Sequence, residues 1–166
     1  MKAGWKRFGM KDMPAGTNMQ WGLQDRIPRG HVTYLAGPGG IGKSLYTWGL
    51  AMSVALGRPF LGSETTQGSV VYVDFDTEAE SQGFMMNKVR RGLGIAPNEL
   101  DGLIHYMTPD PVGVPLDNER LEDLRGIIVN DAPALIILDA FASAMYNVKG
   151  NDSESVSHAM SLIRTL

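Results

Sequence analysis

The sequence predicts an α/β fold in which a mainly parallel sheet is covered by helices on both faces, a three-layer α/β/α arrangement. Short apolar runs alternate with segments of helical periodicity along most of the chain. The apolar runs are continuous rather than alternating, which is typical of parallel strands buried on both sides. The 166 residues are enough for one such domain.

Four strands and four helices are expected. The strands are placed at 31–36, 69–73, 103–107 and 134–138. The first helix is expected at 44–56, with Leu45, Trp48, Met52 and Ala55 on its buried face. The second is expected to run from about Glu78 to the glycine at position 94, with Met85, Val89 and Leu93 facing inward. Asp117 is expected to cap the third helix, which carries Leu121, Leu124 and Ile128. Asn151, with Glu154 three residues later, is expected to begin the last helix.

Residues 1–30 are expected to form an irregular arm and lead-in, and residues 31–166 the core. Glycine and proline punctuate the arm, and Trp5 and Trp21 lie within it. Two readings stay open at this point. The arm lies on its own core through the tryptophans, or it packs on a neighbouring subunit.

Composition narrows the class of protein. Fifteen basic residues against eighteen acidic ones give a net charge of −3, so bulk charge does not favour nucleic-acid binding. The absence of cysteine excludes a disulfide framework and a thiolate zinc site. No apolar run approaches the ~20 residues of a membrane span, and the basic N-terminal stretch has no apolar signal region. We therefore expect a soluble protein of a reducing, cytoplasmic compartment with no membrane partner.

The strongest motif reads GPGGIGKS at residues 37–44 and fits the phosphate-loop pattern G-x-x-x-x-G-K-[ST]. Glycines let backbone N–H groups converge on a phosphate chain, and the following helix adds its N-terminal dipole. Lys43 would bind the β- and γ-phosphates and Ser44 a Mg²⁺ ion. The nucleotide-binding set is Gly37, Pro38, Gly39, Gly40, Ile41, Gly42, Lys43, Ser44 and Leu45. The alternative is a glycine-rich turn that carries lysine and serine by chance.

Two acidic motifs follow predicted strands. The run LIILD at 135–139 places Asp139 at the carboxyl end of a strand, where it would hold the Mg²⁺ water shell. The run DFDTE at 74–78 offers a carboxylate to orient or deprotonate the attacking water, with Asp76 the first choice and Glu78 the second. The alternatives are a strand that happens to end in Asp, and acids that favour a helix dipole.

With these motifs the chain resembles the RecA-like P-loop ATPases, in the branch of the RepA-type hexameric helicases and phage recombination ATPases. The resemblance is carried by residues 21–30, 37–44, 70–77, 135–139 and 150–154, and it spans roughly residues 20–166. It implies ATP and Mg²⁺ as cofactors. It also implies a homo-oligomeric ring or filament, single-stranded DNA as a partner, and a role in DNA replication or recombination.

The chain departs from that family in two ways. Asp76 stands where the family has a catalytic Glu, and a carboxylate ~1 Å short can cost on the order of 10²-fold in rate. Glu78 could substitute. Family members also continue past this point with a strand that inserts between those at 31–36 and 134–138. We therefore expect a core truncated after its fourth βα unit. Either a central slot stays open or something fills it, such as another chain's strand or a direct pairing of the two flanking strands.

Three functions follow from these observations. The first is an ATP-hydrolysing motor core, with Lys43, Asp76 and Glu78 as the catalytic candidates. The second is a nucleotide-dependent assembly or binding module with little turnover. The third, a kinase-like P-loop protein acting on a small molecule, lacks an Arg-rich lid segment in this sequence.

Overall fold

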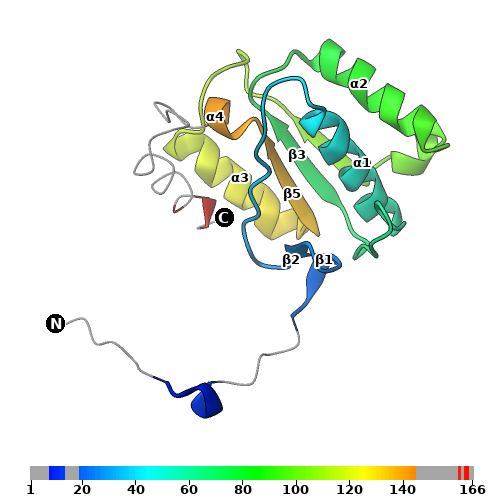
Figure 1. Ribbon diagram of the computed structural model, residues 1–166. Coiled ribbons are helices and arrows are strands. Elements are labelled where there is room, and N and C mark those ends of the chain that lie inside the picture. The colour runs from blue at the N-terminus through cyan, green and yellow to red at the C-terminus, as the bar shows by residue number, and fades with distance from the viewer. Residues whose placement is uncertain (1–7, 14–18, 145–160, 162, 165–166) are drawn as a thin grey trace.

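The centre of the domain is a sheet of three parallel strands in the order β4-β3-β5 (Figure 1). The computed structural model describes residues 8–13, 19–144, 161, 163 and 164. The strands are β3 (Val70–Asp74), β4 (Ile104–Met107) and β5 (Leu135–Asp139). All five residues of β3 are buried because this strand has a neighbour on each side. The parallel pairing confirms the predicted fold class.

Helices cover both faces of this sheet (Figure 1). Helices α1 (Lys43–Leu56) and α2 (Ala79–Gly92) lie on one face, and α3 (Asn118–Asp131) and α4 (Phe141–Ala144) on the other. Alternate side chains of β3 point to opposite faces of the sheet. Val70 and Tyr72 pack toward α1, while Val71 and Val73 pack toward α3. The molecule therefore has the three layers that the sequence predicts.

The helix ends follow local signals that the sequence carries. The carboxylate of Asp117 accepts the amide of Arg120 at 2.9 Å and caps α3 as predicted. Helix α1 ends at Gly57, which adopts a left-handed φ of 63° and donates its amide to the last turn. Leu121 and Leu124 are buried, at 6% and 3% exposure, as expected for the inner face of α3.

The last part of the lead-in forms regular secondary structure, which the sequence did not predict. Strands β1 (Trp21–Leu23) and β2 (Ile27–Pro28) form a short antiparallel hairpin. Leu23 is fully buried, and the hairpin backbone bonds to a neighbouring loop through Gln24 N to Glu64 O and Thr66 N to Gly22 O. Trp21 is half-buried, whereas Trp5 lies outside the described residues. Two 3-10 turns, Met10–Asp12 and Pro97–Leu100, were also not predicted.

The prediction of a strand at 31–36 is wrong. This segment forms no strand, and Tyr34 and Leu35 are 55% and 44% exposed. Within the part of the chain that the structure describes, β5 pairs only with β3, so the direct pairing of 31–36 with β5, one of the three alternatives left open, does not occur. An apolar, β-rich sequence makes a strand only where a neighbour accepts its backbone hydrogen bonds. Here nothing described supplies that neighbour.

Two residues expected in the core are instead exposed. Leu45 is 40% exposed because it lies in the first turn of α1, at the edge of the sheet, and Leu93 is 46% exposed because it follows the last turn of α2. Met86 and Val89 pack against the core from α2, so its inner face is rotated from the predicted one. The predicted start of the last helix, at Asn151 with Glu154, lies outside the described residues.

Candidate functional site

The glycine-rich loop before α1 has the backbone of a phosphate-binding turn. Gly40 and Gly42 adopt φ values of 77° and 92°, in the left-handed region that other residues enter only at a cost. Gly42 is the N-cap of α1 and has no side chain to occupy the first amides of the helix. Those amides and the dipole of α1 therefore remain available to an anion at the loop.

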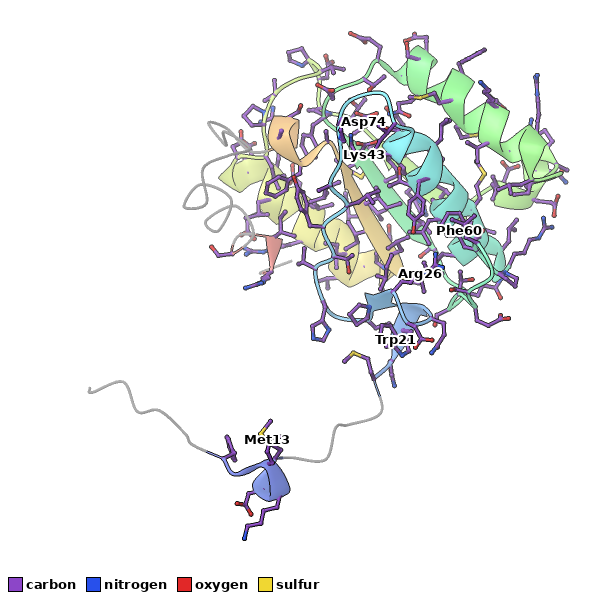
Figure 2. All side chains as sticks on the ribbon, viewed as in Figure 1. Met13, Trp21, Arg26, Lys43, Phe60 and Asp74 are labelled. Atoms are coloured by element: carbon purple, nitrogen blue, oxygen red, sulfur yellow. The ribbon has the colours of Figure 1, made fainter. Side chains whose placement is uncertain are left out.

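Lys43 lies across this loop. Its Nζ donates to the carbonyl oxygens of Gly37 and Pro38, both at 2.9 Å. Two of the three ammonium protons are used in this way, and a phosphate oxygen could accept the third. Figure 2 shows Lys43 and Asp74 at the same end of the domain, where the parallel strands terminate. Ligands of open α/β sheets bind at this end.

Asp139 ends β5 and is tied to α1 by hydroxyl groups. The Tyr72 hydroxyl donates to Asp139 Oδ2 at 2.8 Å and lies 2.9 Å from Thr47 Oγ1. Thr47 Oγ1 also donates to the carbonyl oxygen of Ser44 at 3.1 Å. Burial raises the pKa of Tyr72 well above its usual range, and the Asp139 carboxylate raises it further, so the phenol keeps its proton. The two predicted Mg²⁺ ligands, Ser44 and Asp139, are thus joined through two side chains.

Asp74 ends β3 and lies at the centre of a second buried network. Its Oδ1 accepts the amides of Asp76 and Thr77 at 2.9 and 3.0 Å. Its Oδ2 accepts the side-chain amide of Gln82, whose Oε1 accepts Trp48 Nε1 at 2.8 Å. Asp74 has no exposed surface, and this burial raises its pKa although three hydrogen bonds oppose the shift. The network joins the loop after β3 to both α1 and α2.

The two predicted catalytic acids lie in the loop between β3 and α2, and both are exposed. Asp76 Oδ1 accepts the hydroxyl of Ser143 at 3.0 Å, which links this loop to the segment after β5. Glu78 is the N-cap residue of α2, and its side chain makes no capping hydrogen bond. Because Asp74 and Asp139 are paired in register, the loops after β3 and β5 lie at one edge of the sheet. The structure therefore gathers the predicted residues at one end, while their catalytic roles stay predictions.

Sequence reasoning missed the residues that support this site: Tyr72, Asp74, Gln82 and Thr47. Asp74 carried a signal, since an Asp whose side chain accepts amides two and three residues later is a common turn former. Tyr72 carried a weaker one, a polar group within an otherwise apolar buried strand.

The fold and the loop define a P-loop nucleotide-binding protein. A family model described as AAA domain matches residues 11–165. The chain belongs to this family of P-loop ATPases. A search of curated proteins finds no match. Among the described residues, no helix has the length and apolar character to cross a membrane.

Proposed function

We propose that the chain is the ATP-hydrolysing core of a RecA-like, helicase-type motor that acts in DNA replication or recombination. One observation supports the ATPase assignment most directly. A positive-φ glycine loop, an uncapped helix N-terminus and the Lys43 ammonium converge at the end of the sheet where Asp139 is held. Amides and an ammonium suit the phosphates, and hydroxyl and carboxylate oxygens suit Mg²⁺.

Each residue has a role in this proposal. The loop amides and Lys43 bind the phosphates, and Ser44 and Asp139 hold the metal and its water shell. Bound Mg²⁺ would supply charge neutralisation at the β- and γ-phosphates. Asp76 orients the attacking water and accepts its proton, with Glu78 as the second candidate. Ser143, which donates to Asp76 Oδ1, fixes that carboxylate in the loop.

The resemblance to RepA-type ATPases supports the finer assignments: a homo-oligomeric ring or filament, and single-stranded DNA as the partner. The net charge of −3 argues that any DNA contact is local rather than spread over the surface. Membership of the AAA domain family supports a nucleotide-driven motor without choosing among these roles.

The site is tested by binding of a fluorescent ATP analogue with Mg²⁺. Lys43→Ala should weaken binding at least ~10-fold, because a hydrogen bond to a charged group contributes about 1.5–3 kcal/mol. Lys88→Ala is the matched control, since Lys88 is an exposed lysine on α2, and it should bind as the wild type does. Equal affinity of the Lys43 variant and the wild type would overturn the site assignment.

A second candidate, a nucleotide-dependent assembly module with little turnover, is favoured by Asp76. This side chain is one methylene shorter than Glu and is already hydrogen-bonded to Ser143. Steady-state phosphate release, measured with and without single-stranded DNA, separates the two functions. The motor predicts release that DNA stimulates and that Asp76→Asn abolishes while binding persists. The module predicts binding without release.

A further inference from the structure

We propose that Tyr72 is a positioning residue that holds one oxygen of the Asp139 carboxylate and leaves the other for the metal's water shell. The inference rests on the proposed function, because it takes Asp139 as the acid that serves Mg²⁺. Nothing in the sequence motifs assigns a role to Tyr72. Its place in the sheet and its hydrogen bonds carry the argument.

The strand register places Tyr72 within reach of Asp139. Tyr72 is paired with Ile137 on the neighbouring strand, and Asp139 lies two residues further along. Side chains two residues apart on a strand point to the same face of a sheet. Tyr72 and Ile137 both pack in the cluster on the α1 side, so Asp139 also projects toward α1. The tyrosine is therefore a diagonal neighbour of the carboxylate.

The acceptors at the two ends, the Asp139 carboxylate and the Ser44 carbonyl, determine the direction of the hydrogen bonds. Two hydroxyl groups, those of Thr47 and Tyr72, make three close contacts with only two protons. The Asp139 carboxylate has no proton to give, so Tyr72 must donate to it. The Tyr72 oxygen can then only accept from Thr47, and the single Thr47 proton is divided between this oxygen and the carbonyl oxygen of Ser44. Donation runs from Thr47 to Tyr72 to Asp139, and such chains strengthen each member.

Asp139 depends on this bond for its orientation. Among the residues that the structure describes, the Tyr72 hydroxyl is the one group that hydrogen-bonds to the Asp139 carboxylate, and it occupies Oδ2 alone. The tyrosine ring is itself held by Trp48, which stacks on it at a centroid distance of 4.3 Å and an interplanar angle of 10°. Thr47 and Trp48 are adjacent on α1, so the helix that starts at the phosphate loop contacts both the hydroxyl and the ring of Tyr72.

The test measures how nucleotide binding depends on Mg²⁺. A fluorescent ATP analogue is titrated in EDTA and then at rising Mg²⁺ with wild type, Tyr72→Phe and Tyr106→Phe. Loss of an outer partner of a metal site lowers metal affinity by 10–100-fold. We expect Tyr72→Phe to raise the Mg²⁺ concentration at half-maximal binding at least ~10-fold while its affinity in EDTA stays within twofold of the wild type.

Tyr106→Phe is the matched control. Tyr106 lies beside Tyr72, with ring centroids 6.2 Å apart, and no hydrogen bond joins its buried hydroxyl to Asp139 among the described residues. This variant removes the same atom from the same aromatic cluster and should leave the Mg²⁺ midpoint unchanged. Equal midpoints for the two variants would overturn the positioning role. An equal loss of affinity with and without Mg²⁺ would overturn it too, because that is the signature of a merely structural residue.

Thr47 provides a second route should Tyr72→Phe not fold. Thr47→Val removes the donor to Tyr72 and should shift the Mg²⁺ midpoint in the same direction, by less, while Thr47→Ser should restore it. A wild-type midpoint in Thr47→Val would then count against the inference. The proposed function fails differently: the wild type itself would bind no nucleotide with Mg²⁺.

Discussion

The buried network at Asp74 allows only one arrangement of donors and acceptors, and replacing Asp74 by Asn should expose this. Trp48 Nε1 is a donor only, so the Gln82 oxygen must face it and the Gln82 amide must face Asp74. The two backbone amides of Asp76 and Thr77 face the other oxygen of Asp74. Asp74 must therefore accept on both oxygens, and an asparagine side chain offers one acceptor and one donor.

Either orientation of the new amide sets a donor against a donor. The NH2 group of the asparagine faces the Gln82 amide in one orientation and the backbone amides of Asp76 and Thr77 in the other. A buried donor left without a partner costs about 1–3 kcal/mol. Removing the charge offsets part of this, because burial disfavours the charged form of Asp74. We expect Asp74→Asn to lower the free energy of unfolding by about 1–2 kcal/mol, equivalent to roughly 2–8 °C in Tm.

A double-mutant cycle with Trp48→Phe tests the reasoning. Without the indole N–H, the Gln82 amide is free to turn its oxygen toward the new side chain. Asp74→Asn should then cost about 1 kcal/mol less in the Trp48→Phe background than in the wild type, measured by urea denaturation. The packing lost at Trp48 is common to both arms and cancels. An equal cost in both backgrounds would refute the donor–acceptor argument.

The same pair of proteins gives a pH dependence. The folded-state pKa of Asp74 is raised, so the folded chain holds this proton more tightly than the unfolded chain does. The stability contributed by protonation is present below the unfolded pKa and is lost as the pH rises through the folded pKa. The wild type should therefore gain stability relative to Asp74→Asn as the pH is lowered through that interval. A difference that does not vary with pH would contradict the raised pKa.

Two further predictions concern the ends of α3. Ala132 follows the helix with a φ of 42°, so Ala132→Gly should raise the free energy of unfolding by about 0.5–1 kcal/mol in urea denaturation; a destabilised variant would contradict this. Asp117→Ala removes the cap on the Arg120 amide and should lower the free energy of unfolding by about 1 kcal/mol. Asp117→Asn keeps an acceptor, so its free energy of unfolding should fall by less.

The elements that the sequence predicts well are those specified by local signals. Strands β3 and β5 are runs of apolar residues whose composition suits burial between two helical layers, and α3 begins at a capping Asp. The phosphate loop is specified by glycines that tolerate a positive φ. In each case the residues that determine the structure lie within a few positions of the structure itself.

The elements that the sequence does not predict correctly depend on partners that are distant along the chain. Strands β1 and β2 hold together through a loop some forty residues away, with Thr66 Oγ1 donating to the carbonyl of Trp21. The segment 31–36 has the composition of a strand but pairs with nothing that the structure describes. Local propensity cannot tell these cases apart, because strand formation depends on a neighbour's backbone.

The acidic run at 74–78 shows what the period of a strand adds to a motif. Within β3, positions 70, 72 and 74 alternate with 71 and 73, so Asp74 shares the α1 face with Tyr72 and is enclosed beneath α1 and α2. Asp76 and Glu78 lie beyond the strand, in the loop, where a carboxylate can reach solvent and substrate. The sequence thus separates a structural acid from two functional candidates once the end of the strand is known.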